Sequence, residues 1–344
     1  MYQVETKSEK RDIGLDFLKI FFAFEVFLVH GWSEFTYIYV PGQSFPYSFF
    51  CRMGLVAVPG FVLISFMLTD IYRMANDRTY FKKRIFRLII PHLVWTLIYF
   101  SVYTSGTIAG IFSIPVTVRE LFIQLFTATG YNAVMWFQIA LIIITLILTS
   151  LSRLTGGGYV EDIFWVILFW LCIIGQYSGV NDKIWSNFSL DLWKSYGRIC
   201  EVMPIAIVGA FVQKYHIISL LKHYWLTVTV ALVMGIITIY QYPVFAETGG
   251  DVYNGFWKST MATLIVFIFV CIPKPVINKK AVNVVTIMAI ATPGVYYMQR
   301  LVLTIFVNRD GTHFRYCCII FAMMLIISIG AYVTKNKFLR IIFT

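Results

Sequence analysis

The chain has 344 residues, of which 59% are hydrophobic and only 13% are charged. A soluble globular domain carries about 25% charged residues, so this composition excludes that class. The apolar segments are long and continuous, whereas the strands of a membrane barrel would alternate apolar and polar residues. The composition therefore predicts an all-α, polytopic membrane protein. The net charge of +11 then reflects basic cytoplasmic loops, and no nucleic acid partner is expected.

The apolar pattern predicts about ten transmembrane helices. An even number places both termini on one side of the membrane. With the N-terminus in the cytoplasm, the inside segments contain 18 lysine and arginine residues and the outside segments contain 8. The positive-inside rule therefore predicts cytoplasmic termini, with a membrane domain over residues 1–335 and a short cytoplasmic tail over 336–344. The predicted spans are 13–32, 49–71, 85–103, 133–152, 163–177, 199–212, 224–240, 261–272, 284–305 and 316–333.

The first predicted span carries four ionisable residues, Asp16, Lys19, Glu25 and His30. Such groups are costly inside a bilayer, so their presence indicates a function. On an ideal helix Lys19 and His30 lie about 20° apart around the axis and about 16 Å apart along it. Asp16 shares their stripe, and Glu25 points to the opposite side. Snorkelling toward the interfaces is the alternative explanation for Asp16 and His30, but it does not account for Lys19, about two turns inside the membrane.

The inside loop before the third span reads YFKKRIFRLIIPHLVW and contains Arg84 and Arg87. These two residues are three positions apart, so they share one face where a helix enters the membrane. Guanidinium groups bind phosphate oxygens in a fork geometry, which makes the pair a candidate phosphate site. An ordinary basic anchor against anionic lipid is the alternative.

The outside segments are rich in aromatic residues, as in the stretch from Trp32 to Tyr47. Anchoring at the membrane interface explains most of them, and aromatic platforms for a sugar are an alternative for the remainder. The outside segment between Thr117 and Thr129 contains VRELFIQLF. This amphipathic pattern predicts a helix that lies on the membrane surface.

Together these features predict a phosphorylated donor that enters from the cytoplasm and extends along the stripe from Lys19 to His30. The separation of these two residues is comparable to an extended pantetheine arm. A neutral imidazole at His30 could take the proton of an acceptor hydroxyl as that hydroxyl attacks a thioester. Asp16 would hold Lys19 in place or tune its charge.

The first span and the arginine pair resemble motifs of the membrane acyltransferase family 3. That family includes the O-acetyltransferases of bacterial lipopolysaccharide, capsule and exopolysaccharide. Its opening motif is an acidic residue, a basic residue and a histidine, matched here by Asp16, Lys19 and His30, with lysine where many members have arginine. Its paired arginines at the start of the third helix resemble Arg84 and Arg87.

Weaker likenesses run along the rest of the chain, from about Asp12 to Val333. The family's V-P-x-F…S-G segment resembles Val58 to Ser65, but Phe66 stands where a glycine is usual. Trp136 and Phe137 resemble its W-F-L motif, with Gln138 in place of leucine and Val134 where a histidine is frequent. Residues 294–296 resemble its late G-I-Y motif, with Gln299 where many relatives have histidine.

The resemblance implies an enzyme of the bacterial inner membrane that uses acetyl-CoA or another short acyl-CoA as donor, without a metal. The acceptor would be a hydroxyl of a surface polysaccharide or lipopolysaccharide precursor, free or lipid-linked, and membrane lipid would surround the protein. The family's roles would place donor binding at Lys19, Arg84 and Arg87. Transfer would fall to His30, supported by Asp16.

Two other functions fit the same charges. A transporter or flippase of a lipid-linked sugar or an anion could use them as its substrate path, together with Arg198, Glu201 and Arg300. A membrane subunit of a polysaccharide export assembly would need no chemistry of its own. Within the enzyme hypothesis, direct transfer and an acyl-enzyme on Ser33 or Ser65 both remain open.

Overall fold

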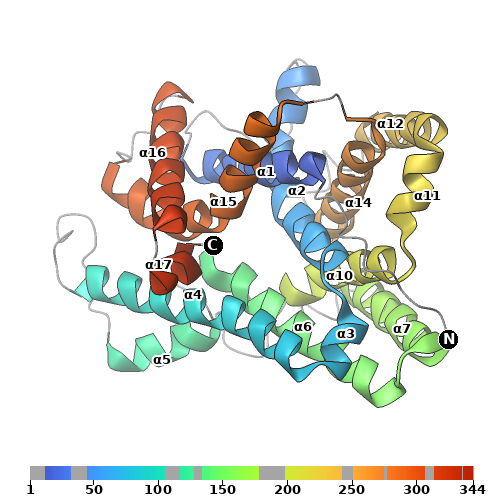
Figure 1. Cartoon of the computed structure of the whole chain (residues 1–344), viewed down its shortest axis with the longest axis horizontal. Coiled ribbons are helices and arrows are strands. Elements are labelled where there is room, and N and C mark those ends of the chain that lie inside the picture. Colours follow the sequence, from blue (N-terminus) through green and yellow to red (C-terminus); the bar gives the residue numbers. More distant parts are fainter. Residues whose placement is uncertain are drawn as a thin grey trace.

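The computed structural model describes residues 12–31, 45–104, 117–127, 134–177, 198–241, 251–274, 277–306, 314–334 and 336–343. These residues form helices and no strand, which confirms the predicted all-α class (Figure 1). Every predicted span overlaps a helix. The helices are α1 (Ile13–Gly31), α2 (Phe45–Met67), α3 (Ile71–Asn76), α4 (Arg78–Thr104), α5 (Val118–Thr127), α6 (Trp136–Thr155), α7 (Gly158–Tyr177), α10 (Arg198–Lys214), α11 (Ile217–His223), α12 (Trp225–Gln241), α14 (Asp251–Cys271), α15 (Lys279–Phe306), α16 (Phe314–Val333) and α17 (Lys337–Phe343).

Among the described residues, five helices are long and apolar enough to cross a membrane: most of α4, α6, α7, α15 and α16. A sixth span is obtained if α10 and α11, which meet at a bend of 76°, are counted as one. Shorter apolar helices cover Gly54–Met67, Trp225–Ile236 and Lys258–Cys271. The protein is therefore multi-pass, while the predicted count of ten and the cytoplasmic termini stay predictions.

Several helices carry apolar side chains on the outside of the protein. Trp170 and Ile174 of α7 are exposed, whereas its acidic Glu161 is buried. The short helix α5 also carries apolar side chains on its outer side, because Phe122 and Phe126 are exposed. Apolar residues outside and polar residues inside suit a lipid solvent, in which backbone and polar groups must find partners within the protein.

The first helix α1 lies against α2 and α15, two helices far from each other in sequence. It runs parallel to α15: the Thr286 hydroxyl donates to the Asp16 carboxylate (3.2 Å) near the start of both helices. At the other end, a Cβ atom on Gly31 would lie 2.7 Å from the Leu303 side chain. The stripe predicted from the sequence is therefore on an unbroken helix, and much of it faces α15.

The second helix α2 makes close contacts on two sides through glycines. Gly60 of α2 accommodates the Phe22 ring of α1, because a Cβ atom there would lie 2.3 Å from that ring. Gly209 of α10 lies against the α2 backbone, where a Cβ atom would be 2.8 Å from the carbonyl oxygen of Leu63. Small residues allow helix backbones to approach closely inside membranes.

We expect Gly209→Ala to destabilise the protein by about 1–3 kcal/mol, because the added methyl group meets backbone that cannot rotate away. The measurement is the midpoint of thermal unfolding of the detergent-solubilised protein. Gly175→Ala in α7 is the matched control, because no atom lies within 4 Å of a Cβ at that position. There the better helix propensity of alanine should leave stability unchanged or slightly raised. Equal midpoints for the two variants would show that the α2–α10 contact tolerates the methyl group.

A charged cluster joins α7 to the end of α10. The Lys214 ammonium lies 2.8 Å from Glu161 Oε2 and 2.6 Å from Asp162 Oδ1. It also donates to the Gly158 carbonyl (3.2 Å), and the Tyr215 hydroxyl donates to Asp162. Because the cation contacts both acids and Glu161 is buried, the cluster fixes the start of α7 against α10.

Candidate active site

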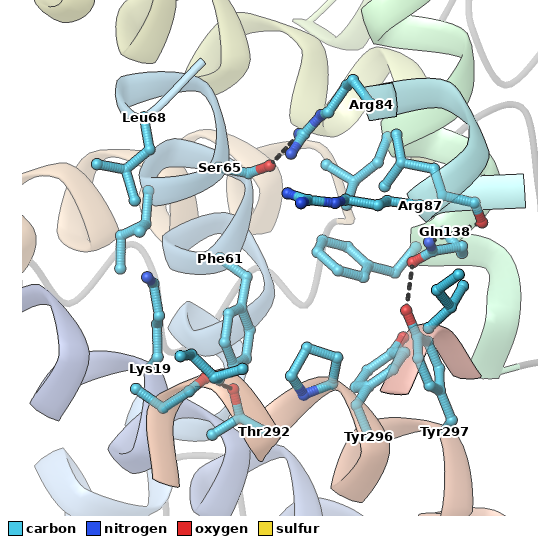
Figure 2. A pocket seen from close by; sticks show the side chains of 18 of the residues that line it. Lys19, Phe61, Ser65, Leu68, Arg84, Arg87, Gln138, Thr292, Tyr296 and Tyr297 are labelled. Carbon is cyan, nitrogen blue, oxygen red and sulfur yellow. Dashed lines mark hydrogen bonds between the residues drawn. The ribbon is translucent and has the colours of Figure 1, made fainter. Parts of the chain in front are cut away.

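A cavity of about 730 Å³ lies between α1, α2, α4, α6, α15, α16 and α17. This volume is within the range of small-molecule binding sites. Figure 2 shows Lys19 reaching into it from one side and the two arginines from the other. Its wall consists of Lys19, Phe61, Ile64, Ser65, Leu68, Thr69, Arg84, Arg87, Leu88, Phe137, Gln138, Leu141, Ala289, Ile290, Thr292, Pro293, Tyr296, Tyr297, Tyr332, Lys337, Arg340 and Ile341. The cavity thus brings together the three cations that the sequence assigned to donor binding.

Lys19 is held by the two helices that meet at the cavity. Its ammonium donates to Asp16 Oδ1 (3.5 Å), one turn earlier on α1. Asp16 is 1% exposed, and its other carboxylate oxygen accepts from Thr286 of α15. Asp16 itself does not line the cavity. The carboxylate therefore lies behind the ammonium, which is directed into the open space.

The arginine pair enters the cavity from the first turns of α4. Nη2 of Arg84 donates to the Ser65 hydroxyl of α2 (2.5 Å), which fixes one edge of its guanidinium (Figure 2). Its buried Nε has no hydrogen-bond partner among the described residues. Arg87 is exposed and directs its guanidinium toward the centre of the cavity. One anchored and one exposed arginine can bind an anion together, because each presents free N–H donors to the same space.

The far wall of the cavity is held by hydrogen bonds that the sequence did not predict. Gln138 of α6 donates through Nε2 to the Leu88 carbonyl of α4 (2.9 Å) and accepts from the Tyr297 hydroxyl (3.2 Å). The Tyr296 hydroxyl donates to the Val134 carbonyl (2.5 Å). These bonds join three helices around the arginine pair, so the cavity is rigid on this side.

Pro293 interrupts the hydrogen-bond ladder of α15 where that helix borders the cavity. A proline has no N–H to donate, so the Ala289 carbonyl loses its usual helical partner. The Thr292 hydroxyl donates to this carbonyl instead (2.9 Å). All three residues line the cavity, which places an irregular turn of helix beside Lys19.

Two cations of the cavity come from α17, the last helix. Lys337 and Arg340 line it, and the Arg340 guanidinium lies over the Tyr332 ring at 4.9 Å. The sequence placed both residues in a short cytoplasmic tail and assigned them no role. Their cationic character was visible in the sequence, but nothing local indicated that α17 packs against α4, α15 and α16.

His30 lies at the opposite end of α1 and is not among the residues that line the cavity. Its side chain is exposed, and Arg198 and Arg300 are close enough to act on it electrostatically. The Arg198 guanidinium also lies over the Trp136 ring at 5.1 Å. Lys19 and the arginine pair therefore lie near one end of α1, and His30 lies at the other.

Other residues singled out in the sequence have different surroundings. Glu25 is fully buried, and neither of its carboxylate oxygens has a partner among the described residues. The amide of Gln299 is likewise buried without a partner in that part of the chain. Glu201 pairs with Lys258 (3.5 Å). Ser65 is the acceptor for Arg84, and Ser33 lies outside the described residues.

Comparison with known proteins gives one family. The family profile described as an acyltransferase domain matches residues 12–333. No curated protein and no solved structure matches the chain. The match begins at the residue before α1 and ends with α16, so it includes Lys19, His30 and the arginine pair but not α17.

Proposed function

The chain belongs to the membrane acyltransferase family 3 and is a membrane acyltransferase, and from this premise we propose that it transfers an acetyl or other short acyl group from acyl-CoA to a glycan hydroxyl. The donor enters from the cytoplasm, and the acceptor is a surface polysaccharide or lipopolysaccharide precursor at the outer side of the bacterial inner membrane. The observation that carries the proposal is the convergence of Lys19, Arg84 and Arg87 on one cavity, at one end of the helix that bears His30 at the other.

In this proposal the basic cavity holds the phosphates of the donor. Arg84 and Arg87 present guanidinium donors to phosphate oxygens, and the ammonium of Lys19 adds a third cation. The pantetheine arm then extends along α1 over about 16 Å to His30. Ala23 and Val26 occupy the same stripe between the two residues, and both are buried in the hydrophobic core. The proposal therefore requires the neighbouring helices to separate along this stripe when the arm binds.

At His30 the transfer is a direct displacement. The neutral imidazole takes the proton of the glycan hydroxyl while the hydroxyl oxygen attacks the thioester carbonyl carbon. The carbon–sulfur bond then breaks, and the CoA thiolate receives the proton from the imidazolium, which leaves an ester and free CoA. Arg198 and Arg300 supply positive charge near the developing oxyanion. Ser65 is not used as an acyl carrier in this proposal, because it lies in the cavity with Arg84, away from His30, which would have to take its proton.

The test is transfer of label by the purified protein in lipid nanodiscs. With acetyl-labelled acetyl-CoA and a lipid-linked glycan, label should move from CoA to the glycan as a base-labile ester. Mass spectrometry of the surface glycan from cells with and without the protein should show the matching mass difference. Label that stays on CoA while glycan crosses the membrane would instead support the transporter alternative.

A further inference from the structure

The C-terminal helix α17 lies at the cavity but outside the residues that the family profile matches. We infer that Lys337 and Arg340 bind the 3′-phosphate of the CoA nucleotide, so that α17 selects donors that carry this phosphate. The inference rests on the proposed function, since it concerns the same donor at the same cavity. It assigns a part of the site to residues that no motif of the sequence indicated.

The position of α17 is fixed by contacts at its C-terminal end. The Trp95 indole donates from Nε1 to the Ile342 carbonyl (3.1 Å), and the Trp95 ring packs edge-on against Phe343 at 5.5 Å. Gly294 of α15 makes room for this end, because a Cβ atom there would lie 2.8 Å from the Phe343 carbonyl oxygen. The helix is thus attached to α4 and α15, the two helices that carry Arg87 and Pro293 in the cavity wall.

The start of α17 is also ordered. Asn336 Oδ1 accepts from the backbone amides of Phe338 (2.9 Å) and Leu339 (3.3 Å), which caps the helix. Lys337 and Arg340 are three positions apart, so they share one face, and this face borders the cavity. In Figure 1 α17 lies between α16 and α4. A capped and anchored helix can therefore hold two cations at a defined place rather than on a mobile tail.

The charge of the cavity matches a donor with three phosphates. Five of the lining residues are cationic, and the lining residues in the described part of the chain include no acid. One of the five, Lys19, is paired with Asp16. A diphosphate together with a phosphomonoester carries about four negative charges near neutral pH, so a cationic wall without an acid suits such a donor.

The helices that carry the cations assign the 3′-phosphate to α17. The reactive end of the donor must point toward His30, and Lys19 is the cavity cation on the same helix. Arg84, which is half-buried and anchored by Ser65, and its neighbour Arg87 then fit the diphosphate. Lys337 and Arg340 line the cavity from a different helix, so the remaining phosphate, the 3′-phosphate of the nucleotide, is assigned to them.

The experiment compares binding of CoA and of 3′-dephospho-CoA to the full-length protein in nanodiscs of neutral phosphatidylcholine. The wild type should bind CoA at least about tenfold more tightly, which corresponds to about 1.4 kcal/mol. K337Q/R340Q should lose this preference by weakening only the binding of CoA. K337R/R340K, which keeps both charges, should retain it. K82Q/K83Q removes two exposed lysines of α4 that do not line the cavity and should behave as wild type.

The outcomes separate this inference from the proposed function. If K337Q/R340Q weakens both ligands equally, or neither, then α17 does not contact the 3′-phosphate and the inference is wrong, although the donor site stands. If the wild type binds CoA and 3′-dephospho-CoA with equal affinity, the inference about α17 is also wrong. If the wild type binds neither ligand, the assignment of acyl-CoA as the donor fails as well.

Discussion

Replacing His30 with alanine should abolish most acyl transfer and leave donor binding unchanged. A general base contributes about 10²–10⁴-fold to a rate, so we expect kcat to fall by that factor. His30 does not line the cavity that holds Lys19 and the arginine pair, so the affinity for CoA should stay within about twofold of wild type. The measurements are label transfer to the glycan and equilibrium binding of CoA, both in nanodiscs.

The combination of the two measurements distinguishes a catalytic role from a structural one. A misfolded variant would lose binding as well as turnover. His223→Ala is a matched control, because this histidine lies at the end of α11 and does not border the cavity. Normal acetylation of the surface glycan by the His30 variant, at normal protein level, would refute the mechanism proposed above.

Replacing Arg84 with glutamine should weaken acyl-CoA binding by about 10–100-fold. A hydrogen bond to a charged group is worth about 1.5–3 kcal/mol, and every 1.4 kcal/mol is about a factor of ten in affinity. The loss should appear mainly in KM, because the proposed role is to hold phosphates far from the reacting carbon. Arg87→Gln should act in the same direction, since its guanidinium enters the same cavity.

Two controls isolate the guanidinium of Arg84. Ser65→Ala removes the hydroxyl that accepts from Arg84 Nη2 but keeps the cation, so it should cost less than Arg84→Gln. Arg78→Gln removes a charge from the first position of the same helix, outside the cavity wall, and should leave KM unchanged. If the Arg84 and Arg87 variants keep the KM of the wild type, the pair does not bind the donor. Its role would then be to anchor the helix against anionic lipid.

The sequence predicted those parts of the fold and site that depend on local pattern. Hydropathy placed the helices because a spanning helix needs a long apolar run. Helical periodicity placed Asp16, Lys19 and His30 on one stripe because α1 is unbroken over these residues. The meeting of Lys19 with Arg84 followed from their shared position near the predicted inside ends of two spans. Each of these inferences used only the local pattern around each residue.

The parts that the sequence did not predict depend on contacts between distant segments. The Trp95 indole and the Ile342 carbonyl are 247 positions apart, and this bond attaches α17 to the cavity wall. The Tyr297–Gln138 bond spans 159 positions. No local pattern specifies such pairs, because each partner alone looks like an ordinary interfacial or buried residue.

Three departures from the family pattern have a structural explanation in these contacts. Phe66 stands where a glycine is usual, and the glycine at this contact is instead Gly209 of α10. Gln138 replaces leucine and binds the Leu88 carbonyl and the Tyr297 hydroxyl. Val134 accepts from Tyr296 through its carbonyl oxygen, and its apolar side chain is buried in the hydrophobic core, where a histidine ring would need a hydrogen-bond partner. The buried amide of Gln299 has no such explanation.

The parallel contact of α1 with α15, and the docking of α17 beside them, constrain when the enzyme can become active during its synthesis. Helix α1 is made before Thr286, Arg340 and Ile342, which complete its surroundings and the cavity wall. A nascent chain inserted up to α14 would contain His30, Arg84 and Arg87 but not the residues of α15 and α17 that line the cavity. The cavity is therefore complete only after α17 has been made, and a product that ends before α15 would lack it.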